Sequence, residues 1–320
     1  MKMAHSSKNE EVVLGKARTP AEYAGLVARG FLMGSADVVP GVSGGTMAFI
    51  LGIYEELIDS IRAVARPPFW KALVGLRIGE ALKAVNAGFL IALLSGILLA
   101  VLSLAKGLEW LLENQPVYLW SFFFGLVLAS VWTVGKRIPR WPPLLIGALL
   151  VGAVGAYILV GLVPLQTPET PWFLFLSGAL AICAMILPGI SGSFILVLLG
   201  KYQFVLGAVN DRDFVTIAIV GAGAVIGLVT FAQVLGWLFK RYHDLAIALL
   251  TGLMVGSLRK IWPWKEVLAT ITDRHGALIP TVEANILPAT FGSEVVIALG
   301  LAILGFVLVL LLDKLANQKG

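Results

Sequence analysis

The chain has 320 residues, of which 58% are hydrophobic and only 13% are charged, and its formal net charge is +5. A soluble globular protein carries roughly 25% charged residues, so this composition excludes a soluble enzyme, a nucleic-acid-binding protein and a disordered chain. The basic excess lies in short loops between apolar stretches, where membrane proteins collect lysine and arginine.

The N-terminal segment 1–20 is polar and mixed in charge, without the apolar core of a signal peptide, so we expect a short cytoplasmic tail. A single cysteine, Cys183, excludes an intrachain disulfide, and the three histidines lie in the tail or beside charged loop residues. The sequence therefore predicts neither a metal site nor a cofactor.

Apolar stretches suited to crossing a membrane recur along the whole chain. About 30 Å of hydrocarbon requires roughly 20 apolar residues in a helix. We expect six ordinary spans, at 86–105, 117–135, 142–163, 214–239, 245–258 and 292–312.

Two further apolar regions, 23–61 and 171–209, are each interrupted near the middle. The first break reads Pro-Gly-Val-Ser-Gly-Gly at 40–45, and the second reads Pro-Gly-Ile-Ser-Gly-Ser at 188–193. An arm of about 17 residues rises only about 25 Å, which is short for a full crossing. We therefore predict two re-entrant helical hairpins whose tips lie at membrane depth, shielded from lipid by other helices.

The two breaks match each other at an offset of 148 residues, with seven identities in fifteen positions. A weaker match at an offset of 127 relates spans 117–135 and 245–258. The predicted fold class is an all-α polytopic membrane protein with an inverted-topology repeat, because three crossings per half turn the second half over. Repeat 1 covers 21–163 and repeat 2 covers 170–313, each a re-entrant hairpin followed by three transmembrane helices.

The basic residues set the expected orientation. If each hairpin enters and leaves on one side, sixteen lysines and arginines face the cytoplasm and seven face outward. This agrees with the positive-inside bias. We therefore expect a multi-pass protein of the cytoplasmic (inner) membrane with both termini cytoplasmic.

Each break restarts a helix, and the first N–H groups of a helix lack internal partners and attract anions. Two facing tips would form a cradle for phosphate or carboxylate. The predicted phosphate-binding residues are Ser43, Gly44, Gly45, Thr46, Ser191, Gly192 and Ser193. The alternative is that these small residues only allow helices to pack closely.

Four charged residues near the predicted membrane segments are further candidates. Asp37 lies three residues before Pro40, where a carboxylate is costly, so it could couple a proton or ion, or cap nearby N–H groups. Arg29 could pair with a phosphate or anchor its helix at the interface. Arg259 and Lys260 could capture an anionic head group, or only extend toward the interface as basic side chains do.

A family signature occupies the first broken region. The run from Gly30 to Thr46, GFLMGSADVVPGVSGGT, resembles that of the bacterial and archaeal polyprenyl-phosphate transporter family, formerly a domain of unknown function, and the segment 187–193 supports it. The resemblance covers about residues 21–313. It implies a flippase that returns undecaprenyl phosphate from the outer to the inner leaflet for cell-wall synthesis, with Asp37 and the two tips as functional positions. The coupling ion is left open.

Three other functions are alternatives to the transport of a lipid phosphate. A transporter or channel for a small inorganic anion would share the architecture. The Gly-Val-Ser-Gly at 41–44 resembles the motif of rhomboid intramembrane serine proteases, but no histidine lies within a predicted span to serve as base. A lipid phosphatase would need clustered histidine and arginine. The sequence therefore favours transport of a lipid phosphate over catalysis.

Overall fold

The computed structural model describes residues 18–38, 43–164, 167–272, 278–288 and 290–317. The elements are α1 (Pro20–Asp37), α2 (Gly44–Ile50), α3 (Tyr54–Ala63), α4 (Pro67–Val74), α5 (Ile78–Ala84), α6 (Ala87–Asn114), α7 (Pro116–Gly135), α8 (Pro143–Leu159), α9 (Pro171–Ile186), α10 (Gly192–Leu198), α11 (Tyr202–Asn210), α12 (Phe214–Arg241), α13 (His243–Ser257), β1 (Lys265–Thr272), β2 (Leu278–Asn285) and α14 (Ser293–Asn317). Most of the predicted tail, and Pro40 and Gly41 of the first break, lie outside the described residues.

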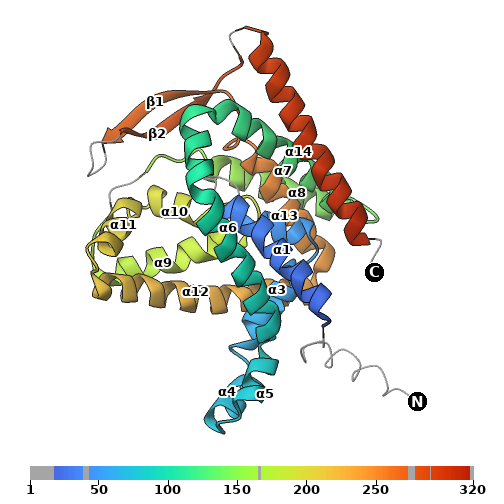
Figure 1. Cartoon of the computed structure of the whole chain (residues 1–320), viewed down its shortest axis with the longest axis vertical. Helices are drawn as coiled ribbons and strands as arrows, with labels where there is room; N and C mark the ends of the chain where they lie inside the picture. Colours follow the sequence, from blue (N-terminus) through green and yellow to red (C-terminus); the bar gives the residue numbers. More distant parts are fainter. Residues whose placement is uncertain (1–17, 39–42, 165–166, 273–277, 289, 318–320) are drawn as a thin grey trace.

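The described chain is helical, as predicted, except for one antiparallel hairpin formed by β1 and β2. The all-α expectation did not include this hairpin, because residues 265–285 are neither strongly apolar nor regularly patterned. Figure 1 shows the hairpin at one end of the molecule, while α4 and α5 project from the other end.

Four helices are long and apolar enough to cross a membrane: α6, α7, α12 and α14. The pair α10 and α11, bent by 108°, would make a fifth. Helix α8 has 17 residues and is shorter than the expected span 142–163, whereas α13 has 15 residues, close to the short span expected at 245–258. These lengths correspond to about 26 and 23 Å. The chain is thus a multi-pass membrane protein in which α8 and α13 are short helices packed on each other.

Eight of the described helices associate in four pairs: α1 with α6, α9 with α12, α7 with α14 and α8 with α13. Each pair has a glycine at its closest point, where an added Cβ would lie within 2.1 Å of a carbonyl oxygen of the facing helix. These glycines are Gly96, Gly223, Gly125 and Gly252. Small residues at such crossings let two backbones approach closely, which is how helices associate without a hydrophobic driving force.

Each broken region has a second interruption of its helix, which was not predicted from the sequence. Three residues separate α2 from α3, and three separate α10 from α11. Gly52 and Gly200 lie in these gaps with φ of +69° and +63°, a conformation that glycine adopts without steric cost. Each region is therefore one long helix followed by two short ones.

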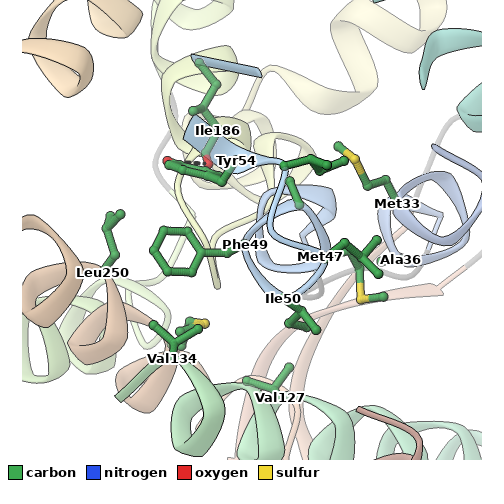
Figure 2. Packing of buried hydrophobic residues seen from close by; sticks show 14 of the residues in the cluster. Met33, Ala36, Met47, Phe49, Ile50, Tyr54, Val127, Val134, Ile186 and Leu250 are labelled. Carbon is green, nitrogen blue, oxygen red and sulfur yellow. Dashed lines mark hydrogen bonds between the residues drawn. The ribbon is translucent and has the colours of Figure 1, made fainter. Parts of the chain in front are cut away.

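The first short helix, α2, lies at the centre of the hydrophobic core, and all seven of its residues are buried. Figure 2 shows Phe49 and Ile50 of α2 among Val127 and Val134 of α7 and Leu250 of α13. Both halves of the chain therefore pack around this helix. A helix end buried in this way needs partners for its polar groups, which are costly to leave unsatisfied.

Candidate functional site

The beginning of α2 is held by two side chains of the same broken region. The Gly44 N–H donates to Oδ1 of Asp37 at 2.7 Å, and the Gly45 N–H donates to Oγ of Ser43 at 3.1 Å. Asp37 therefore caps α2, which is one of the two roles considered for it. The first two N–H groups of α2 therefore donate to side-chain oxygens of this chain.

The first break contacts the second directly. The Ser43 hydroxyl lies 3.2 Å from the carbonyl oxygens of both Met185 and Leu187, at the end of α9. The Gly189 N–H donates to Oγ1 of Thr46 at 2.9 Å. Ser43 and Thr46 are each only 1% exposed. Two predicted site residues of the first tip thus bind the backbone of the second break, more than 140 positions away.

A third hydrogen bond joins the same segments. The Tyr54 hydroxyl, at the start of α3, donates to the Ile186 carbonyl at 3.1 Å, shown as a dashed line in Figure 2. Tyr54 and residues 185–187 were not among the site residues predicted from the sequence. The match of Tyr54 with Tyr202 in the repeat could have indicated Tyr54. The acceptors could not have been predicted, because every residue has a main-chain carbonyl group.

The junction leaves no room for additional atoms at its glycines. A Cβ on Gly45 would lie 2.5 Å from the Ile186 carbonyl oxygen. A Cβ on Gly189 would lie 2.6 Å from Oγ of Ser257, and Gly189 has a φ of +88°. The small residues of the two breaks therefore allow close packing, which was the alternative to phosphate binding, and the same junction also contains hydrogen bonds.

The second tip is more open than the first. Ser191 is buried, whereas Ser193 is exposed, and their Oγ atoms lie 2.7 Å apart. No side chain of a described residue caps α10, and a Cβ on Gly192 would lie 2.7 Å from the Ala181 carbonyl oxygen. Within the described part of the chain no hydrogen bond joins these serines to Ser43 or Thr46. The structure thus brings the breaks together through the first-tip hydroxyls and the second-break backbone.

Arg259 and Lys260 share a pocket near the second tip. Its lining consists of Val160, Gly161, Leu162, Val163, Phe194, Arg259, Lys260, Lys265, Glu283 and Asn285. Phe194 directly follows Ser193 in the chain. Lys265 and Glu283 were not predicted from the sequence, because neither lies near a break.

Two other basic residues differ in their surroundings. Arg29 lies half-buried on α1 and forms no ion pair with any residue that the structure describes. Lys201, between α10 and α11, is 1% exposed, and its Nζ donates to the Thr167 carbonyl at 2.6 Å. A lone lysine inside the apolar region 171–209 was visible in the sequence, but its burial was not anticipated.

The chain matches a family model described as undecaprenyl phosphate translocase-like over residues 33–279. A polyprenyl-phosphate transporter of Vibrio cholerae is 44% identical over 302 residues, covering 92% of this chain and 98% of the relative. A polyprenyl-phosphate transporter of Staphylococcus aureus is 30% identical over 255 residues, covering 74% and 85%. No solved structure matches the chain. The residues matched by the family model include both breaks, and the chain belongs to the undecaprenyl phosphate translocase-like family.

Proposed function

We propose that this protein is a transporter that moves polyprenyl phosphate, in bacteria undecaprenyl phosphate, from the outer to the inner leaflet of the cytoplasmic membrane. The observation that carries the proposal is the 44% identity to the Vibrio cholerae polyprenyl-phosphate transporter over nearly the full length of both chains. The relatives are named as transporters, which supports transport rather than catalysis.

The element order supports an inverted repeat with halves 21–163 and 170–313. The short helices α2 and α10 have seven residues each and begin 148 positions apart, and α3 and α11 also begin 148 positions apart. The pairing of α1 with α6 has its counterpart in α9 with α12, and that of α7 with α14 in α13 with α8. Each half then consists of a re-entrant hairpin and three transmembrane helices, with α4 and α5 added in the first half and β1–β2 in the second, and the substrate path lies between the halves.

The junction of the two breaks suggests how a phosphate could be bound and released. A phosphate with three acceptor oxygens could replace the Asp37 carboxylate at the beginning of α2, because both are anions that accept from the same N–H groups. Ser43, Thr46, Ser191 and Ser193 would supply hydroxyl donors, while the isoprenoid tail stays in lipid. The structure then represents a closed state, in which Asp37 takes the place of the substrate and could take up a proton when displaced.

Purified protein in proteoliposomes should accelerate the movement of a fluorescent polyprenyl monophosphate between leaflets. Ser43→Ala and Ser191→Ala should each reduce this rate, because a hydrogen bond to a charged group contributes about 1.5–3 kcal/mol, or roughly tenfold or more. Ser103→Ala, on the exposed face of α6, is the matched control. Transport of inorganic phosphate without transport of the lipid would instead support the small-anion alternative.

We also propose that both termini are cytoplasmic and that β1–β2 faces outward. Figure 1 shows the start of α1 and the end of α14 on the side away from the hairpin, which supports this orientation. In a Cys183→Ala background, Glu266→Cys on β1 should react with a membrane-impermeant maleimide in intact cells. Gly79→Cys on α5 should react only after permeabilisation. Both positions are exposed, so the reverse labelling pattern would contradict the orientation.

A further inference from the structure

A pocket at the base of the β1–β2 hairpin brings together three basic side chains. Arg259 and Lys260 follow the end of α13, and Lys265 is the first residue of β1. The Arg259 guanidinium donates to the Tyr157 carbonyl at 2.9 Å and lies 4.4 Å from the centre of the Tyr157 ring. The Arg259 guanidinium is therefore held in place by α8, and it forms no ion pair with an acidic side chain among the described residues.

One carboxylate serves the two lysines. Oε2 of Glu283, on β2, lies 2.9 Å from Nζ of Lys260 and 3.4 Å from Nζ of Lys265. The three side chains are largely buried, with 27% of Lys260, 9% of Lys265 and 23% of Glu283 exposed. With Arg259, three cations line a pocket with a single carboxylate, so the pocket has an excess of positive charge.

We infer that this pocket binds a phosphomonoester head group, and that the Glu283 carboxylate occupies the place of the phosphate until substrate replaces it. The inference rests on the proposed function, because it identifies where the lipid head group would first bind. A phosphate monoester carries about −1.5 to −2 charges at pH 7 and three acceptor oxygens. It would therefore pair with both lysines more completely than one carboxylate oxygen does.

The location of the pocket fits a first binding step. Phe194 forms one wall, Nζ of Lys260 lies 5.6 Å from the centre of its ring, and the preceding residue is the exposed Ser193. A head group leaving the lysines would therefore meet the second tip next. Glu283 is carried by an isolated two-stranded hairpin, an element that is only marginally stable by itself, so its displacement does not require the helices to move.

The pH dependence of phosphate binding is a second property by which this pocket can be tested. Burial is the main cause that lowers the pKa of Lys265 to about 8; Glu283 opposes this shift and the neighbouring Lys260 adds to it. The α7 side of Lys265 contributes the uncharged Trp120 ring, whose centre lies 4.5 Å from Nζ, and Arg259 lines the same pocket. Lys265 is positively charged below this pKa and neutral above it. Binding of a phosphate should therefore weaken as the pH rises through about 8.

The test is calorimetric titration of the purified full-length protein with farnesyl monophosphate, farnesol and inorganic phosphate. Glu283→Gln should bind farnesyl monophosphate about fivefold more tightly, because it removes an ion pair that competes with the ligand. Lys260→Met and Lys265→Met should weaken binding. Lys265→Arg should retain binding above pH 8, because arginine stays charged. Glu266→Gln, the same change on an exposed residue of β1, is the matched control and should bind as the wild type does.

Each result of these titrations either supports or contradicts the binding of a phosphomonoester in the pocket. Equal or weaker binding by Glu283→Gln, or no binding by the wild type, would show that the ion pairs only dock the hairpin. Tighter binding cannot result from misfolding, so a gain supports the inference directly. Binding of inorganic phosphate as tight as that of farnesyl monophosphate would assign the site to free phosphate and overturn the lipid head group as its ligand. Wild-type proteoliposomes that do not transport polyprenyl phosphate would reject the proposed function separately, whatever the titrations show.

Discussion

Gly45→Ala is expected to abolish most transport, because the added methyl group would lie 2.5 Å from the Ile186 carbonyl oxygen at the junction of the two breaks. The obstacle is backbone rather than a flexible side chain, so one of the two segments must move. Overpacking of this kind costs about 1–3 kcal/mol, which corresponds to roughly 5- to 150-fold in the population of the native junction. The measurement is the rate of polyprenyl-phosphate movement in proteoliposomes, together with thermal stability in detergent.

The matched control for this variant is Gly25→Ala on α1. Nothing lies within 4 Å of a Cβ built at Gly25, and alanine favours a helix more than glycine does. Transport by Gly25→Ala should equal that of the wild type, with equal or slightly higher stability. Wild-type transport by Gly45→Ala would mean that the tip contact seen here is not part of the transport cycle.

Asp37→Asn is expected to lower transport by about tenfold or more while leaving the fold intact. Asparagine keeps an oxygen that can accept from the Gly44 N–H, now bonded to Asp37 at 2.7 Å, but it removes the charge. Asp37→Ala removes the acceptor too and leaves a buried N–H unpaired, which costs about 1–3 kcal/mol. Thermal unfolding should therefore distinguish the two variants, with only the alanine variant losing stability.

Asp213→Asn provides a control for the loss of charge at a helix cap. Asp213 caps α12 by accepting from the N–H groups of Val215 and Thr216, each at 3.1 Å, and it is exposed and outside both breaks. Its substitution should leave transport unchanged. If Asp37→Asn also transported normally, Asp37 would be a structural cap and its proposed role in coupling would be rejected.

The sequence located the two breaks because proline, glycine and serine recur together at an offset of 148 within otherwise apolar segments. It also singled out Asp37, since a lone carboxylate in such a segment has a large desolvation cost. It did not show that Ser43 and Thr46 contact the second break, because their partners are main-chain atoms of residues 185–189. The pattern of apolar residues does not predict which main-chain groups form hydrogen bonds between distant segments.

Only two of the charged residues of the pocket at the base of the β1–β2 hairpin were predicted from the sequence, for a related reason. Arg259 and Lys260 follow an unusually short apolar stretch, which marks them in the sequence. Lys265 and Glu283 lie on a hairpin with register irregularities and no clear alternation of apolar residues. Their meeting depends on the pairing of two strands, which is a tertiary property.

The contacts between the breaks have a consequence for how sequences of this kind can diverge. Ser43 and Tyr54 bind the carbonyl oxygens of residues 185–187 and none of their side chains. Substitutions at those three positions that preserve the backbone path and fit the neighbouring side chains therefore keep every one of these bonds. Mutational tolerance should consequently be asymmetric, with the donor hydroxyls restricted to a few residue types and the acceptor positions free to vary among apolar ones.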